Sequence, residues 1–130
     1  MYLVKTYLDK SGIHGIGVFA GEDISKGTVV WDFVEGIDRA YTQSEFDALP
    51  ATARSYLEFY AFWDKGMIYK CGDHGCYTNH SDAPNTGNWP EPDSMSEVAL
   101  RDIKKGEEIT SDYRTFDEPS RENLQSVIGA

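Results

Sequence analysis

The sequence predicts a mostly β fold of small sheets that carries one short helical insert. Two patterns support this: six short segments rich in β-branched or aromatic residues lie between turn-forming residues, and one stretch has helical periodicity. The chain has 130 residues, of which 40% are hydrophobic. This length and composition suit a single domain with one core.

The predicted strands begin and end near Gly, Asp, Asn or Ser, which favour turns, whereas Val, Ile, Thr and aromatic residues favour extended backbone. We expect strands at residues 2–8, 17–20, 28–33, 67–70, 97–101 and 108–113. The span 85–96, with Pro90 and Pro92, is expected to be an irregular loop.

The helical insert is expected at residues 42–63, where apolar residues recur at steps of three and four. Thr42 and Glu45 match a capping box, which predicts the start of a helix. Pro50 should divide the stretch into two helices, because proline lacks the backbone N–H and is tolerated only where a helix begins.

A weak internal repeat relates residues 20–30 to residues 99–109, and both copies contain Asp-Ile-x-Lys-Gly between two predicted strands. Gly27 and Gly106 are expected at a turn position with positive φ. Each copy therefore predicts a hairpin. Two hairpins would suggest two small sheets in a pseudo-symmetric arrangement, although a common turn sequence used twice would give the same pattern.

The charge balance excludes some partners, since 12 Lys and Arg oppose 22 Asp and Glu for a net charge of -10. Such a chain repels nucleic acid and attracts basic protein segments. The apolar runs fall far short of the ~20 residues that cross a bilayer, which predicts no membrane association. The start lacks the pattern of a secretory signal, so the protein is expected inside the cell, in the cytoplasm or the nucleus.

Residues 71–85 hold the densest cluster of chemically active side chains. Cys71, His74 and Cys76, with His80 as a fourth ligand, could bind zinc, but their spacing is not typical of zinc sites. His80-Ser81-Asp82 cannot form a hydrolytic triad, because adjacent residues do not point at one another.

Two further segments draw attention. The glycines of His14-Gly15-Ile16-Gly17 would let the backbone approach a ligand closely, although a tight turn explains them equally well. The segment 107–113 reads as a strand that ends in Tyr113, a residue that packing alone could explain.

In this order and spacing the three segments resemble a SET domain. The resemblance rests on three motifs: Gly15-Ile16-Gly17-Val18-Phe19-Ala20, Asn79-His80-Ser81-Asp82-Ala83-Pro84-Asn85 and Ile103-Lys104-Lys105-Gly106-Glu107-Glu108-Ile109-Thr110-Ser111-Asp112-Tyr113. It implies a β-clip fold of small curved sheets with a C-terminal pseudoknot. The SET domain would span residues 1–118, with the helical insert at about 42–63.

The resemblance also implies a protein-lysine methyltransferase that uses S-adenosylmethionine and binds no metal. His14, Gly15, Ile16 and Gly17 would line the methionine part of the cofactor. Asn79 and His80 would hold its amino and adenine ends.

Tyr113 would be the catalytic tyrosine implied by the resemblance, with Phe116 and Tyr77 in an apolar substrate channel. Tyr69 and Trp89 are further candidates for the channel wall. Such a channel would disfavour the ammonium form of lysine, whose neutralisation near pH 7.5 costs about 4 kcal/mol.

This sequence departs from the family pattern at Cys76, where Arg is common, and at Asp82, where Cys often follows the Asn-His-Ser motif. The zinc-binding cysteine segments that flank many relatives do not appear in it. The tail at 119–130 is therefore expected to close the site, or a second subunit of a homodimer would contribute that wall.

The leading hypothesis is a stand-alone lysine methyltransferase whose substrate is a basic, lysine-bearing protein or peptide, such as a histone-like tail. The alternative hypothesis is a non-catalytic SET-like protein-interaction module. A small zinc protein ranks third.

Overall fold

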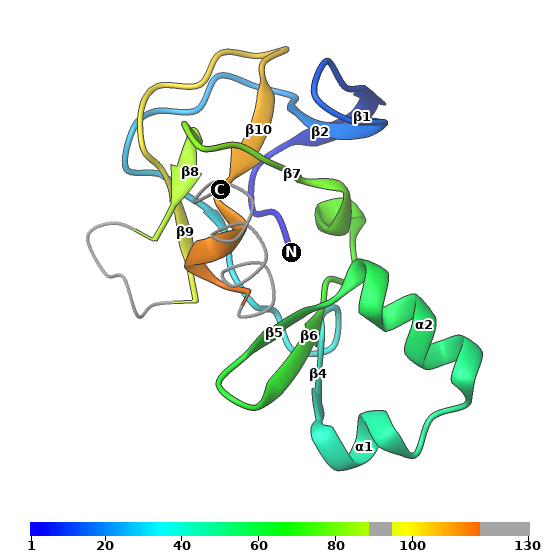
Figure 1. Ribbon diagram of the computed structural model, residues 1–130. Coiled ribbons are helices and arrows are strands. Elements are labelled where there is room, and N and C mark those ends of the chain that lie inside the picture. Colours follow the sequence, from blue (N-terminus) through cyan, green and yellow to red (C-terminus); the bar gives the residue numbers. More distant parts are fainter. Residues whose placement is uncertain (89–94, 118–130) are drawn as a thin grey trace.

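Three small β-sheets make up most of the structure, a computed structural model that describes residues 1–88 and 95–117 (Figure 1). The largest sheet has the order β1 (Thr6–Lys10), β2 (Ile16–Ala20), β10 (Glu108–Ser111) and β7 (Asn79–His80). The second sheet has the order β3 (Val29–Trp31), β9 (Glu97–Ala99) and β8 (Thr86–Gly87). The third has the order β4 (Arg39–Thr42), β6 (Met67–Lys70) and β5 (Phe62–Asp64). The prediction of a mostly β fold of small sheets is confirmed.

The two copies of the internal repeat pair with each other, so the prediction of two separate hairpins is wrong. Strand β2 pairs with β10 and β3 pairs with β9, which places the two strands of each copy in different sheets. Ile24 and Ile103 join the copies through reciprocal N–H···O bonds of 2.7 and 2.8 Å. Gly27 and Gly106 take the predicted positive φ, at 86° and 91°. The arrangement is pseudo-symmetric because each copy satisfies the backbone groups of the other.

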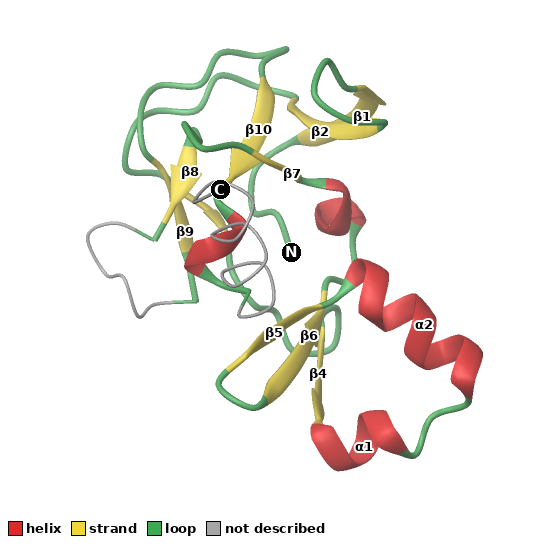
Figure 2. Cartoon of the chain, viewed as in Figure 1, coloured by secondary structure: helices red, strands yellow, loops and turns green. Residues whose placement is uncertain are grey.

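The helical insert contains two helices, α1 (Gln43–Asp47) and α2 (Ala51–Tyr60), as Pro50 predicted. Figure 2 shows both helices at one end of the molecule, beside the β4–β6 sheet. The capping box is present: Thr42 Oγ1 accepts from Glu45 N, and Glu45 Oε1 accepts from Thr42 N, each at 3.1 Å.

The helix was expected to reach residue 63, but it ends at Tyr60 and the chain turns into β5. Ala61 is extended, and Trp63 pairs with Ile68 of β6. The Trp63 ring packs against Phe46 of α1, with ring centroids 5.5 Å apart. The spacing of apolar residues continues from α2 into β5 because both elements pack on the same small core of Phe46, Leu57 and Ile68.

The structure contains four strands that the sequence did not predict, and β1 begins later than predicted. Strands β4, β5, β7 and β8 have two to four residues each and were not expected. Strand β1 begins at Thr6 rather than at residue 2, and Tyr2 instead makes a single bridge to Trp31. Such short strands exist because neighbouring strands lie within hydrogen-bonding range, which local residue preferences do not report.

The main core is built mostly from the first and second sheets, and β10 contributes Ile109 to it. Its fully buried members come from both repeat copies and the strands around them: Val18, Ala20, Ile24, Val30, Ala99, Ile103 and Ile109. Asn85, which is 2% exposed, ties the preceding loop to β10: its Nδ2 donates to Glu108 O at 2.8 Å and its Oδ1 accepts from Thr110 N at 2.9 Å. This anchoring places the residues after β10 against the 78–80 segment.

Strand β10 runs antiparallel to β2 and parallel to β7, so the segment that leads to Tyr113 is inserted between two distant parts of the chain. The predicted pseudoknot and the tail at 119–130 involve residues 118–130, which lie outside the described residues. Both stay predictions, as does the domain boundary at residue 118. Within the described ranges, no helix is long and apolar enough to cross a membrane.

Candidate active site

A cavity of about 540 Å³ opens where the second and third sheets meet the segment after β10. Aromatic side chains from all three regions form much of its wall: Tyr2, Trp31, Phe59, Tyr60, Phe62, Tyr69, Tyr113 and Phe116. The predicted channel residue Phe116 lies on this wall and contacts Phe62, with ring centroids 5.1 Å apart. Tyr69 also lies there, stacked on Phe62 at 5.2 Å.

Tyr77 occupies a different place from the one predicted. It packs edge-on against Tyr60 of α2, with ring centroids 6.0 Å apart, and is not among the described residues that line the cavity. Trp89 lies outside the described residues. The channel role of Tyr77 stays a prediction.

Tyr113 stands at the cavity wall on a short 3-10 helix (Tyr113–Thr115) that directly follows β10. Its hydroxyl donates to the backbone oxygen of Thr78, and its ring contacts His80 and Phe116 edge-on at 5.3 and 5.6 Å. Burial, with the nearby Asp117 carboxylate, raises the pKa of Tyr113 to about 12. The phenol is therefore neutral at physiological pH and fixed in direction, so it can serve as a hydrogen-bonding group but not as a base.

The Asn79 side chain joins the glycine loop to β10. Its amide nitrogen lies within hydrogen-bonding distance of four acceptors: Ser11 Oγ at 3.0 Å, His14 O at 3.0 Å, Ile16 O at 3.2 Å and Glu108 Oε2 at 2.9 Å. One amide carries only two hydrogens, so these acceptors exceed what Asn79 can satisfy. Ser11 Oγ in turn donates to the Glu108 carboxylate at 2.7 Å, so the glycine loop and β10 are tied together through these side chains.

Glycine is required on both sides of this acceptor set. Gly15 has a φ of 49°, a left-handed conformation that other residues adopt at a cost. At Gly17 an added Cβ would lie 2.4 Å from Glu108 Oε2 and 3.2 Å from the Asn79 amide nitrogen. A positive φ therefore explains Gly15, and the close approach of side chains explains Gly17, two glycines that the sequence left open between a turn and a ligand site.

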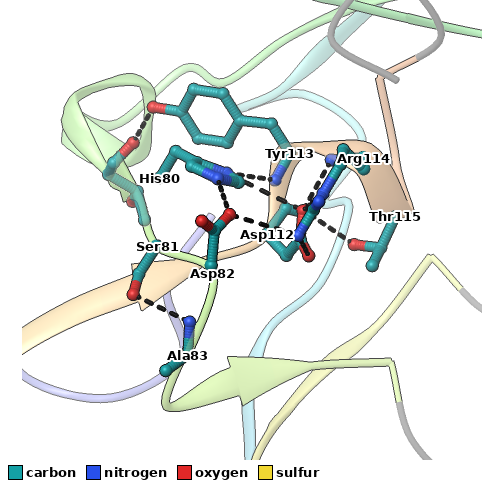
Figure 3. A network of polar contacts seen from close by, with 9 residues as sticks. His80, Ser81, Asp82, Ala83, Asp112, Tyr113, Arg114 and Thr115 are labelled. Carbon is teal, nitrogen blue, oxygen red and sulfur yellow. Dashed lines mark hydrogen bonds and ion pairs between the residues drawn. The ribbon is translucent and has the colours of Figure 1, made fainter. Parts of the chain in front are cut away.

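The His80 ring holds Tyr113 in place (Figure 3). Its Nδ1 accepts from the Tyr113 backbone N–H at 3.1 Å, so the ring proton lies on Nε2, which donates to Asp82 Oδ1 at 2.9 Å. Arg114 extends the network to Asp112 at 2.7 Å and to Asp82 at 3.2 Å. Hydrogen bonds from Arg114 lower the pKa of Asp112 despite its partial burial.

His80 therefore acts on the site first by orienting Tyr113. Its backbone pairs with Ser111 of β10 in parallel register. A cofactor contact by His80, expected from the resemblance, stays a prediction. Asp82, a departure from the family pattern, has a defined partner in Arg114.

The zinc hypothesis finds no support in the geometry. In the part of the chain that the structure describes, Cys71, His74 and Cys76 do not converge; the group with metal-binding spacing is Asp38, Cys71 and Asp73. The Asp38 carboxylate is already held by the Met1 amine at 2.5 Å and by backbone N–H groups. His74 Nε2 bonds Thr6 Oγ1 at 2.6 Å.

The cavity also contains a carboxylate that sequence reasoning missed. Glu97 on β9 borders the cavity, and burial raises its pKa to about 7 despite an opposing hydrogen bond from Thr86. Side chains two apart on a strand share a face, so Glu97 points to the same side as the fully buried Ala99. That alternation is the sequence signal that could have identified it. An apolar channel was expected from the sequence. The cavity wall is instead largely aromatic and includes the carboxylate of Glu97.

Comparisons with known proteins point to one family. Residues 15–114 match the SET domain family. The chain is 27% identical over 132 aligned positions to histone-lysine N-methyltransferase 2D of Homo sapiens and to the Mus musculus protein of the same name, covering 97% of this chain. It spans about 2% of the length of those two relatives.

Solved structures show the same fold. A crystal structure of a Plasmodium falciparum protein described as a candidate histone methyltransferase is 26% identical, with a TM-score of 0.58 over 85% of this chain and 93% of that one. A structure of Polycomb Repressive Complex 2 from Chaetomium thermophilum bound to GSK126 has a TM-score of 0.64 at 22% identity, over 95% of this chain and 17% of that one. The family match covers residues 15–114 and includes all three motifs, so the chain belongs to the SET domain family.

Proposed function

We propose that this protein is a protein-lysine N-methyltransferase that moves a methyl group from S-adenosylmethionine to the ε-amine of a lysine in a protein substrate. The observation that carries the proposal is the Tyr113 hydroxyl, held in a fixed direction at the wall of an aromatic cavity. Family membership and the histone methyltransferase relatives support the same activity.

The residues present fit the cofactor. The carbonyl oxygens of His14 and Ile16 and the Glu108 carboxylate lie together around the Asn79 amide, and oxygen acceptors at a glycine loop suit the ammonium group of an amino-acid-like ligand. S-adenosylmethionine, when bound, supplies a methyl group on a positively charged sulfur. The assigned cofactor residues are His14, Gly15, Ile16, Gly17, Asn79 and His80.

The protein's own task is alignment. Methyl transfer to an amine is an in-line displacement, so the catalyst gains most by fixing the amine in the attack direction. The neutral Tyr113 hydroxyl donates to the Thr78 carbonyl, so its oxygen can accept from a group at the reacting centre without ionising, because its pKa lies near 12. The His80 ring maintains that position through the Tyr113 backbone.

The substrate is proposed to be basic. The net charge of -10 attracts Lys- and Arg-rich segments and raises their rate of association. The histone methyltransferase relatives agree with such a partner. A location in the nucleus or elsewhere inside the cell follows as part of this proposal.

Two variants test the assignment. Tyr113→Phe removes only the hydroxyl, so S-adenosylmethionine should still bind in a calorimetric titration while methyl transfer to mixed core histones falls on the order of 100-fold or more. Tyr7→Phe, on β1 and 40% exposed, is the matched control and should retain activity. Equal turnover by Tyr113→Phe and the wild type would refute the role of Tyr113.

Asn79→Ala should instead weaken cofactor binding about 10-fold or more, because it removes a buried side chain that organises the acceptor set. Circular dichroism of this variant checks that the fold is intact. The absence of S-adenosylmethionine binding by the folded wild-type protein would contradict the proposed function.

A further inference from the structure

We propose that the Glu97 carboxylate receives the positively charged amine of the substrate lysine and takes its proton before methyl transfer. The inference rests on the proposed function and names a second catalytic residue for it. It starts from the position of Glu97 in the cavity and from the chemistry that the reaction requires of the amine.

Glu97 lies beside an aromatic residue of the cavity wall. Its register partner on β3 is Trp31, and both residues line the same cavity as Tyr113. Thr86 on β8 lies beside the Glu97 carboxylate, and its hydroxyl donates to the backbone oxygen of Thr110 on β10 at 2.7 Å. Glu97 is thereby held beside the strand that carries the catalytic tyrosine three residues later.

Tyr2, which lines the cavity with Glu97, connects to Tyr113 through Thr78. Burial raises the pKa of Tyr2, and the charge of Glu97 adds to this effect. The Tyr2 hydroxyl lies 2.6 Å from Thr78 Oγ1, and the Thr78 carbonyl accepts from the Tyr113 hydroxyl. Glu97 and Tyr113 therefore line the same cavity, with Tyr2 and Thr78 also on its wall.

Within the described residues, no cationic side chain forms an ion pair with Glu97. An unpaired, largely buried carboxylate costs free energy unless a charged partner arrives from outside. Trp31 and the other aromatic faces around it would add cation–π attraction for an ammonium group.

The remaining acidic groups of the cavity are less suited to this task. Asp117 accepts from the Trp63 backbone N–H at 2.8 Å. Glu58 is exposed at the rim on α2. The other titratable side chains that line the described part of the cavity are Asp64, Lys65, Cys71 and four tyrosines. Glu97 alone combines burial with a pKa shift toward neutrality, to about 7.

The proton transfer balances without a further reactant. One N–H bond of the lysine ammonium breaks and an O–H bond forms on Glu97, which leaves the electron pair on nitrogen. That pair forms the new N–C bond as the C–S bond of the sulfonium donor breaks and its electrons stay on sulfur. The methylated product leaves as an ammonium ion, and Glu97 returns its proton to solvent. An acceptor whose pKa lies near the working pH suits both the uptake and the return.

The first test measures binding without turnover. n-Butylamine, which is an ammonium ion at pH 8, mimics the lysine side chain, and 1-butanol is its neutral counterpart. Both are titrated into ¹³C-labelled protein by NMR, with the Glu97 carboxyl signal assigned from its loss in Glu97→Gln. Butylammonium should shift that signal in the wild type and bind roughly 10-fold more weakly to Glu97→Gln, while 1-butanol binding stays unchanged.

The second test follows turnover on mixed core histones. The wild-type kcat should rise with pH through the titration of Glu97 near 7, whereas Glu97→Gln should lose this dependence and at least about 10-fold in kcat at pH 7.5. Glu97→Asp keeps the charge and should recover part of the pH dependence and part of the kcat. Glu35→Gln removes an exposed charge outside the cavity and should behave as the wild type.

The outcomes separate the two proposals. Equal butylammonium binding and equal pH profiles for Glu97→Gln and the wild type would overturn the role of Glu97 and leave the methyltransferase assignment standing. Failure of the wild type to bind S-adenosylmethionine would overturn the methyltransferase assignment and, with it, the proton-acceptor role. In that case the butylamine titration still reports whether Glu97 contacts a cation.

Discussion

Replacing Glu97 by Gln should stabilise the protein at alkaline pH and hardly at all in acid. The pKa of Glu97 is raised from 4.5 to about 7 by burial, so the folded state holds a proton that the unfolded state has already released. For a carboxyl group with a raised pKa, the penalty on folding is absent below the unfolded pKa. It develops between pH 4.5 and about 7 and is complete above that.

The size of the effect follows from the shift. About 2.5 pKa units correspond to about 3 kcal/mol at pH values above 7, and about 1 kcal/mol of this is already present at pH 5. Gln has nearly the shape of Glu, keeps a hydrogen bond to Thr86 and carries no charge at any pH. The advantage of Glu97→Gln over the wild type in free energy of unfolding should therefore grow by about 2.5 kcal/mol from pH 5 to pH 8.5.

Urea denaturation followed by circular dichroism at both pH values measures this difference. Glu35→Gln changes the net charge equally at an exposed site, so it separates the local effect from the relief of general repulsion. A difference between Glu97→Gln and the wild type that stays constant with pH would refute the reasoning. A less stable Gln variant at pH 8.5 would refute it as well, because the native carboxylate would then be favourably paired.

Two further predictions concern the elements that position Tyr113. Asn85→Ala leaves the Glu108 carbonyl and the Thr110 N–H without their buried partner and should lower the free energy of unfolding by about 2–3 kcal/mol; a loss below about 0.5 kcal/mol in urea denaturation would contradict this. Gly106→Ala places a side chain at a φ of 91° and should cost about 1–2 kcal/mol, whereas Gly12→Ala, in open space without a positive φ, should not destabilise. Equal stability of the two alanine variants would show that the turn tolerates a side chain.

Under the two proposals, polar groups in the cavity lower the stability of the fold but serve the reaction. Tyr113 and Glu97 are both polar groups with raised pKa values in one cavity. Titratable groups perturbed in this way cluster at functional sites. The phenol stays neutral over the physiological range, while the carboxyl changes state within it, which assigns orientation to the first and proton transfer to the second.

Much of the fold could be predicted from local sequence patterns. The capping box at Thr42 and Glu45, the break at Pro50 and the positive φ of Gly27 and Gly106 are each confirmed, because each depends on a few neighbouring residues. The family was predictable from three motifs, because close backbone approaches and a buried polar loop need particular residue types.

Only the tertiary structure decided which segments pair. The two repeat copies could each have formed a hairpin, but the strands of one copy pair with those of the other. Trp63 could have extended α2, but it lies in β5. A turn sequence and an apolar period are compatible with several partners, and the choice belongs to the packing of the whole core. The tertiary structure likewise placed Glu97 in the cavity beside Trp31 and Tyr113, because burial raises a pKa only through residues that are distant along the chain.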